Sequence, residues 1–429
     1  MPRRGKSLPA GRQASLSAKF FLYHWAISPC SSVDRASGCG PEGRRFDSCQ
    51  GHIILNSMKK SLRTWIEVDK KAVAENYRIF SSLIKNDCQL IGVVKSNAYG
   101  HSLLDYAKEL QSLGIKWLAV DSIVEGEALR KEGITTKILV LGHSLPTKAT
   151  EAIKNNLSLT ISSLEILNNI SKLNFSGKIK LHLKIDTGMH RQGFYISDLK
   201  KVISILKKNK DKFEVEGVYT HFAAAKNPSF PEETNKQITE FEKAIAIIKE
   251  SGFKPIFHCA ATSSTLLFPK SHFDAVRIGI GIYGLWPSRE TQSFSEDKIK
   301  LSPALSWKTI ISEIKNLKKG DQIGYDFTES VSRNSKIAIL PIGYWHGYPR
   351  TLSSIGHVSI KGKLAKVLGR VSMDMVVVDI TKIKNVKLGD EVTLLGKDIS
   401  ADYLANMTET SCNYEVVTRI NPLIKRFFV

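Results

Sequence analysis

The stretch that decides the fold is QLIGVVKSNAYGH, residues 89–101. Its first half is a short apolar run, which predicts a buried β-strand. Its second half begins with Lys95, and a helical pattern, SLLDYAKELQSLG, follows. A lysine at the end of a buried strand is either a solvated surface residue or a reactive amine. Other features of the sequence are needed to choose between these two interpretations of Lys95.

Further apolar runs follow at regular intervals, separated by helical or loop segments. After QLIGVVK they are WLAVDS, KILVLG, LSLTIS, IKLHLKI, FEVEGVYTH, KPIFHCA and FDAVRIG, which makes eight in all. Strand–helix alternations of this kind over about 200 residues predict a parallel (β/α)8 barrel of the TIM type. An open doubly wound sheet is the alternative, but no Gly-x-Gly-x-x-Gly turn follows the first strand.

The rhythm changes after YGLWPS, residues 283–288. Short alternating strands such as KIAILPIG, HVSIKGKLAKVLG and EVTLLG follow, and they predict a mainly antiparallel β domain. We therefore divide the chain into a barrel at 58–298 and a C-terminal β domain at 299–429. Residues 1–57 have no sustained period, and SSVDRASGCGPEGRRFDSCQG resembles a translated transfer-RNA gene. We expect them to be a non-native extension outside the fold.

The composition of the chain argues against a membrane protein, a nucleic-acid-binding protein and a metalloprotein. The chain has 429 residues, 42% hydrophobic content and a formal net charge of +21. No apolar run is long enough to predict a membrane span. The positive charge is spread along the chain without a basic stripe or zinc-ligand spacing, so we expect no nucleic-acid partner and no metal site. Scattered cysteines suit the reduced thiols of a cytoplasmic protein.

Polar side chains stand at the carboxyl ends of several predicted strands, which is where barrel enzymes carry their chemistry. The set comprises Lys95, Lys184, Arg191, His221, Thr262, Ser263 and Arg277. The segment RIGIGIYG, beyond the last strand, offers glycines that let a backbone approach a phosphate closely. A reactive lysine across the barrel mouth from a phosphate site indicates pyridoxal phosphate, whose aldehyde bonds to a lysine amine.

The motifs VVKSNAYGH, KIDTGMHRQG, YTHF, RIGIGIYG, IGYDFTE, PIGYWHGYPR, LGRVSMD and NYEV resemble those of the alanine racemase family, which are fold-type III enzymes dependent on pyridoxal phosphate. The motifs occur in the family's order and extend from the region of Thr64 to the C-terminus. The resemblance implies an isomerase that interconverts L-alanine and D-alanine and supplies D-alanine for peptidoglycan in the cell wall. It also implies a homodimer with shared active sites.

The resemblance assigns two catalytic bases. Lys95 binds pyridoxal 5'-phosphate and is one base, while Tyr325 is the other and reaches the site from a partner subunit. Arg277 faces the pyridine nitrogen of the cofactor, and His221 links that arginine to the tyrosine.

The resemblance also assigns binding roles. Arg191 lies near the substrate carboxylate, and Lys184 matches a lysine that is carbamylated in some members. The phosphate-side contacts are Tyr99, Thr262, Gly279, Ile280 and Tyr414, with Ser263 as an alternative to Thr262. Tyr344 and Met373 match substrate contacts that come from the partner.

Two other functions stay open at this point. A broad-specificity amino-acid racemase of the same fold is one, because Trp345 and His346 depart from the family pattern where substrate enters. A non-catalytic protein that binds pyridoxal phosphate is the other. The β domain with Tyr325 argues against it, since a cofactor carrier needs no second base.

Overall fold

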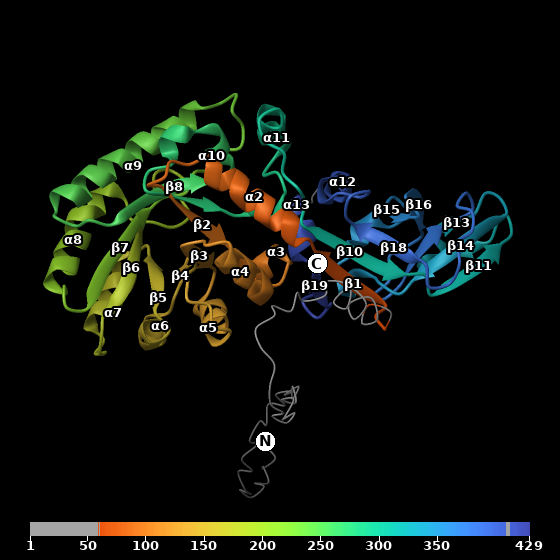
Figure 1. Cartoon of the computed structure of the whole chain (residues 1–429), viewed down its shortest axis with the longest axis horizontal. Coiled ribbons are helices and arrows are strands. Elements are labelled where there is room, and N and C mark those ends of the chain that lie inside the picture. Colours follow the sequence, from red (N-terminus) through yellow and green to blue (C-terminus); the bar gives the residue numbers. More distant parts are fainter. Residues whose placement is uncertain (1–58, 60, 409–411) are drawn as a thin grey trace, which may run out of the picture. The chain divides into compact units, whose positions relative to one another are not determined.

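The computed structural model describes residue 59, residues 61–408 and residues 412–429. Within this part, the predicted runs form a closed barrel of parallel strands that pair in chain order (Figure 1). Their bounds are β2 (Gln89–Val93), β3 (Trp117–Val120), β4 (Lys137–Val140), β5 (Leu157–Ile161), β6 (Ile179–Lys184), β7 (Phe213–Tyr219), β8 (Ile256–Ala261) and β9 (Ala275–Ile278). The barrel prediction is therefore confirmed. The expectation for residues 1–57 concerns positions outside the described residues.

Helices cover the outside of the barrel (Figure 1). They are α4 (Leu103–Ser112), α5 (Ile123–Lys131), α6 (Ala149–Lys154), α7 (Leu164–Lys172), α8 (Leu199–Lys208), α9 (Glu232–Glu250) and α10 (Thr262–Leu267). The hydroxyl of Ser122 caps α5 by accepting the N–H of Glu125, as expected of serine at a helix start. On α8, Leu199, Val202 and Leu206 are buried at helical spacing. A helix of this kind buries one apolar stripe and leaves its other face to solvent.

The barrel interior contains an apolar cluster and, beside it, a group of buried polar side chains. One cluster is apolar and consists of Ile91, Val93, Trp117, Ala119, Leu139 and Ala275. Beside it His182, His258 and Arg277 are buried as well. Gly217 of β7 leaves room for one of these rings, because a Cβ there would lie 2.2 Å from Nδ1 of His182. The interior is thus a packed core that contains a polar column.

A second, nine-stranded sheet has the order β11-β14-β17-β16-β15-β18-β10-β1-β19. The bounds are β10 (Leu305–Ile310), β11 (Glu313–Leu317), β14 (Ser335–Leu340), β15 (His357–Ile360), β16 (Lys363–Leu368), β17 (Val376–Asp379), β18 (Glu391–Leu395) and β19 (Arg426–Phe428). Its pairs are antiparallel except for β1 with β19. The prediction of a mainly antiparallel β domain is confirmed.

Strand β1 (Thr64–Val68) belongs to the nine-stranded sheet, although it lies within the bounds predicted for the barrel domain. The sequence interpretation placed residues 58–298 in the barrel domain, but β1 pairs with β10 and β19 in the nine-stranded sheet. Its side chains Trp65, Ile66 and Val68 are buried there. Helix α2 (Lys70–Ser82) then begins, capped by the carboxylate of Asp69. A short strand carries no local signal for the sheet it joins, so tertiary packing decides.

The C-terminal segment supports the first barrel loop. Arg426 of β19 donates its Nε–H to the carbonyl of Gly100 at 3.1 Å. Helix α13 (Asn413–Thr418) contacts the turn α3 (Lys95–Tyr99). The segment that bears Lys95 is therefore held by the barrel and by elements from the end of the chain.

Candidate active site

A cavity of about 910 Å³ opens at the carboxyl ends of the barrel strands. It brings together the residues that the sequence predicted from separate motifs, and its lining includes Lys95, Tyr99, Lys184, Arg191, His221, Thr262, Ser263, Arg277, Gly279, Ile280 and Tyr414. Tyr325, Tyr344 and Met373 are not among its lining residues. The described residues contain no cluster of His, Cys, Asp and Glu suited to a metal ion. Within the same residues, no helix is long and apolar enough to cross a membrane.

Lys95 stands at the start of an unusual left-handed turn. Strand β2 ends at Val93, two residues earlier than the sequence suggested. Ser96, Asn97, Ala98 and Tyr99 all have φ between 51° and 56°. Non-glycine residues visit this region singly as a rule, at a cost of roughly 1–2 kcal/mol each. Strain of this size persists only where the surrounding structure fixes the backbone, and it gathers at functional sites.

Hydrogen bonds from several elements hold the turn in place. The Ser96 N–H donates to the Glu125 carboxylate at 2.7 Å, and the other oxygen of Glu125 accepts the Asp121 N–H at 2.8 Å. At the far end, the Asn97 side chain accepts the Leu103 N–H at 2.9 Å. Glu125 therefore links the turn to the end of β3. Sequence analysis missed this role, although Glu125 follows the serine cap of α5 by three residues, which is a recognisable capping position.

Asp121 is a second residue that the sequence analysis did not single out. Its Oδ1 lies 3.3 Å from Nζ of Lys95, and both side chains are partly exposed at the cavity mouth. An ion pair of this kind contributes little to stability. Its geometric effect is to hold the lysine amine toward the end of the neighbouring strand β3. The available signal was the position of Asp121 at the carboxyl end of the predicted strand WLAVDS.

Arg277 of β9 is buried without a carboxylate partner among the described residues. Its Nη2 donates to the carbonyl of Thr220 at 2.7 Å and to that of Cys259 at 3.0 Å. Its Nη1 lies 2.7 Å from Nδ1 of His258, and its Nη2 lies 3.2 Å from Nδ1 of His221. Burial lowers the pKa of Arg277, but a guanidinium stays charged at neutral pH. The carbonyl dipoles and the imidazoles therefore solvate the charge of Arg277 in place of water.

The arginine fixes the tautomers of the histidines around it. A guanidinium only donates, so the Nδ1 atoms of His221 and His258 accept, and their protons sit on Nε2. Nε2 of His258 lies 3.0 Å from Nδ1 of His182, and Nε2 of His182 lies 3.9 Å from the carboxylate of Glu216. The N–H groups of this polar column therefore all point the same way, from Arg277 toward Glu216. Burial lowers the pKa of His221 to about 3, and Arg277 adds to that effect, so this imidazole is neutral.

Lys184 and Arg191 make the same side of the mouth strongly cationic. Lys184 is buried, and its Nζ donates to Oε1 of Gln192 at 3.2 Å. Burial lowers the pKa of this lysine to about 8, and the nearby charges of Arg191, Arg277 and Lys95 act in the same direction. Near neutral pH a fraction of the amine is therefore unprotonated and nucleophilic.

The opposite side of the mouth suits an anion. The hydroxyl oxygen of Thr262 accepts the N–H groups of Gly279 and Gly281 at 3.2 and 3.4 Å, which leaves its proton free to donate. A Cβ on Gly279 would lie 2.8 Å from the Tyr99 hydroxyl. Glycine is thus required for this close approach. Burial raises the pKa of Tyr99 to about 12, so its phenol keeps its proton and can donate. Hydroxyls and backbone amides of this kind fit a phosphate group.

The residues expected from a partner lie together on the β domain. Tyr325 begins the 3-10 turn η5 (Tyr325–Phe327), between the short strands β12 (Gln322–Ile323) and β13 (Glu329–Ser330). The N–H groups of Tyr344 and Trp345 donate to the carbonyls of Ser372 and Met373, which joins two of the predicted segments. We call the following set the tyrosine face: Tyr325, Phe327, Tyr344, Trp345, Met373 and Met375. All six are exposed, Tyr325 to 68%.

The fold and the mouth together define a class of protein, a two-domain barrel that carries a lysine at its mouth opposite a group of hydroxyls and backbone amides. Comparisons then identify the family. The family profile described as "Alanine racemase, N-terminal domain" matches residues 68–287, and "Alanine racemase, C-terminal domain" matches residues 304–428. The chain belongs to the alanine racemase family.

Individual relatives agree with this assignment. The chain is 37% identical to an alanine racemase of Leptospira interrogans over 385 residues, which is 87% of this chain and 98% of that protein. A crystal structure of alanine racemase from Bacillus anthracis with bound L-Ala-P superposes with a TM-score of 0.81 at 37% identity, covering 86% of this chain and 95% of that one. Alanine racemase of Clostridium difficile 630 superposes with a TM-score of 0.82 at 32% identity, covering 86% and 96%.

Proposed function

We propose that this chain racemises alanine with two bases, Lys95 of one subunit and Tyr325 of the partner subunit. The observation that carries the proposal is the division of the site. Lys95 and the cationic and anion-binding groups line one barrel mouth, whereas Tyr325 is exposed on the β domain of the same chain. A single chain therefore supplies one base to its own mouth. Racemisation needs a second base on the other side of Cα.

The residues of the mouth fit pyridoxal 5'-phosphate. The amine of Lys95 would bind its aldehyde, and Arg277 would face its ring nitrogen. Hydroxyls of Tyr99, Thr262, Ser263 and Tyr414, with the backbone of Gly279 and Ile280, would hold the phosphate. When bound, the cofactor supplies an electron sink that makes the Cα proton of the substrate acidic. Arg277 would leave the ring nitrogen without a proton, because a guanidinium does not release one near neutral pH.

The chain's own residues would then orient substrate and move its proton. Arg191 would bind the alanine carboxylate, since a guanidinium recognises a carboxylate with two parallel hydrogen bonds. The Lys95 amine would take or return the proton on one face of Cα, and the phenol of the partner subunit's Tyr325 would do so on the other. Neutral His221, held at Nδ1 by Arg277, would present its Nε2–H to that phenol.

Lys184 is proposed as a carbamylation site. Its neutral amine fraction can attack carbon dioxide, and the carbamate would place a negative charge among Arg191, Arg277 and Lys95. That charge would offset the mutual repulsion of the cations and orient Arg191. A homodimer in the cytoplasm remains the setting that the sequence predicts.

A substrate panel tests this function. Purified protein with pyridoxal phosphate is offered L-alanine, L-serine, L-lysine and L-arginine in turn, and formation of each D-enantiomer is measured. Fastest turnover of alanine, in both directions, supports the proposal. Comparable rates for several amino acids would make it a broad-specificity racemase. Retention of the cofactor with no turnover of any of them would make it a binding protein.

A further inference from the structure

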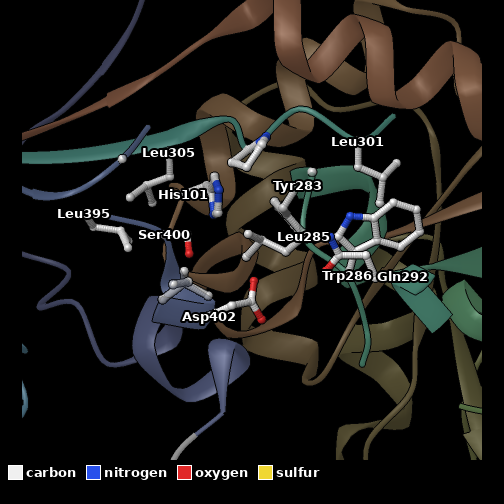
Figure 2. Close-up of a pocket in the computed structure, with 15 residues that line it drawn as sticks. His101, Tyr283, Leu285, Trp286, Gln292, Leu301, Leu305, Leu395, Ser400 and Asp402 are labelled. Atoms are coloured by element: carbon white, nitrogen blue, oxygen red, sulfur yellow. The ribbon is translucent and has the colours of Figure 1, made fainter. Parts of the chain in front are cut away.

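A second cavity, of about 260 Å³, lies where the chain passes from the barrel into the β domain. Figure 2 shows its lining, which comes from His101, from residues 283–286, from β10 and β18, and from the start of α12 (Ala401–Asn406). The wall is about half apolar, and its apolar part includes Leu285, Leu301, Leu305 and Leu395. We call it the junction cavity. None of the proposed cofactor or substrate contacts lines it.

His101 presents an unused acceptor in this wall. The ring is fully buried, and its Nδ1 lies 3.0 Å from the carbonyl of Tyr99. A carbonyl only accepts, so Nδ1 carries the proton and Nε2 has a lone pair. Burial lowers the pKa of His101 to about 4, so the ring is neutral. Nε2 has no hydrogen-bond partner among the described residues, and a buried acceptor without a partner is unfavourable.

Asp402 adds a negative charge to the same cavity. Its Oδ1 accepts the Asn413 side-chain amide at 2.9 Å, and that amide also donates to the Trp286 carbonyl at 2.8 Å. The carboxylate has no ion-pair partner among the described residues, and Arg289 acts on it only from a distance. Burial raises the pKa of Asp402. The cavity thus combines two acceptors, one of them anionic, with apolar walls.

We propose that the junction cavity binds a small organic ammonium ion with a short apolar body. The N–H of such a ligand can donate to the Asp402 carboxylate, and its charge offsets that of the carboxylate. Its apolar part can cover the leucines. Concave apolar walls with a few convergent polar groups are the usual features of small-molecule sites. The volume lies below the usual range of about 300–1,000 Å³, so the ligand is smaller than a drug.

The cavity shares side chains with the support of the Lys95 turn. The His101 ring lies 4.6 Å from that of Tyr283, and Tyr283 lies 4.9 Å from Tyr99. The hydroxyl of Tyr283 donates to the carbonyl of Val93 at 2.8 Å. A ligand in the junction cavity therefore contacts the packing that fixes Lys95 and Tyr99, without touching the barrel mouth.

The probe is N,N-dimethylbutylamine. As a tertiary amine it carries one N–H when protonated and cannot form an imine with an aldehyde, so the proposed cofactor will not capture it. Binding to the full chain, with cofactor present, is followed by calorimetry and by the imidazole NMR signals of His101. We expect saturable binding at one site per chain. The neutral analogue butyl methyl ether, which has no donor, should bind at least tenfold more weakly.

Two variants locate the site, and this binding test does not require racemase activity. Leu395→Trp should abolish probe binding by filling the cavity. Asp402→Asn should weaken it at least tenfold, while Asp297→Asn, which removes an exposed carboxylate outside the cavity, should leave it unchanged. Saturable binding that survives both Leu395→Trp and Asp402→Asn would overturn the location. Equal binding of the ether, or no binding at all, would overturn the proposed ligand class.

Discussion

The barrel mouth and the tyrosine face differ in how completely one chain builds them. In the mouth, Arg277 is 4% exposed and donates to three carbonyls and two imidazoles. On the tyrosine face, Tyr325 is 68% exposed and Met373 is 55% exposed. Exposed apolar groups gathered in this way mark an interaction surface. The contrast indicates that one chain builds the binding groups of the mouth by folding alone, and we propose that a partner subunit covers the tyrosine face and receives Tyr325 in its own mouth.

The two regions also differ in backbone strain and in the hydrogen bonds that offset it. The left-handed turn after β2 places four non-glycine residues in a costly region, at roughly 1–2 kcal/mol each. Bonds from Glu125 and Arg426 offset that cost within one chain. Among the described residues, the tyrosine face is held by backbone bonds, by the Asn421 side-chain amide, which donates to the Trp345 carbonyl at 3.1 Å, and by the ion pair of Asp326 with Arg370 at 3.0 Å. Substitutions in the two regions should therefore have different consequences.

The largest effect is expected in the mouth. Lys95→Ala removes both the proposed cofactor attachment and one base, so racemase activity should fall by more than about 10⁴-fold, with loss of the visible absorbance of bound cofactor. Lys254→Ala, at an exposed lysine before β8, is the matched control and should retain both. Activity and absorbance that persist in Lys95→Ala would make the lysine a rim residue after all.

On the tyrosine face we expect a large loss of activity, with proton exchange lost for one enantiomer and retained for the other. In Tyr325→Phe, racemisation should fall by about 10²–10⁴-fold, equally in both directions, because an enzyme cannot change the equilibrium constant. Exchange of the Cα proton with deuterated solvent should not fall equally. We propose that the tyrosine serves the L-face and Lys95 the D-face of Cα, so exchange should nearly stop for L-alanine and continue for D-alanine through Lys95. Matching losses for both enantiomers would point to a structural role for the phenol.

A smaller effect concerns the cationic side of the mouth. Lys184 has a pKa of about 8 in the folded chain against an ordinary 10.5, so between these values the unfolded chain binds more protons. Wild-type stability therefore carries a penalty at pH 7 that disappears as the pH rises through this window. Lys184→Met should be more stable than wild type at pH 7, on the order of 1 kcal/mol, and should lose that advantage by about pH 10.

Urea unfolding in buffers free of carbon dioxide measures this difference, because carbamylation would itself remove the positive charge. The cofactor-free protein is used, so that ligand binding does not contribute. An advantage that is the same at pH 7 and pH 10 would mean that the lysine is not a buried cation. Lys180→Met, at a neighbouring lysine of β6 that is partly exposed, serves as the control and should show no such pH dependence.

Much of the barrel mouth was predictable because strand periodicity and strand ends are local features. Eight apolar runs indicated the barrel, and Lys95, His221 and Arg277 were found by their positions after or within those runs. Strand β1 was not identified as a strand, and its residues were included in the barrel bounds of 58–298, since five residues do not specify a distant partner. The left-handed turn was missed, because its sequence, KSNAY, contains no glycine that would signal positive φ.

The polar column shows the other limit of sequence analysis. His182 and Glu216 lie on neighbouring strands and are joined to Arg277 only through His258. Taken singly, each histidine in a strand suggests a buried structural residue. Its tautomer and direction follow only from the side-chain geometry around a guanidinium. Glu125 was missed for a similar reason, since its contact with Ser96 spans the end of β3.

Mixing two inactive variants tests the division of the site most directly. Subunits with Lys95→Ala and subunits with Tyr325→Phe are unfolded together, refolded together with pyridoxal phosphate, and assayed for alanine racemisation. In a symmetric dimer with shared sites, a hybrid has one mouth with both bases and one with neither. Random mixing then predicts recovery of about one quarter of wild-type activity, since half the dimers are hybrids with one working site each. Activity in the mixture that stays at the level of the separate variants, although hybrids are shown to form, would contradict the account.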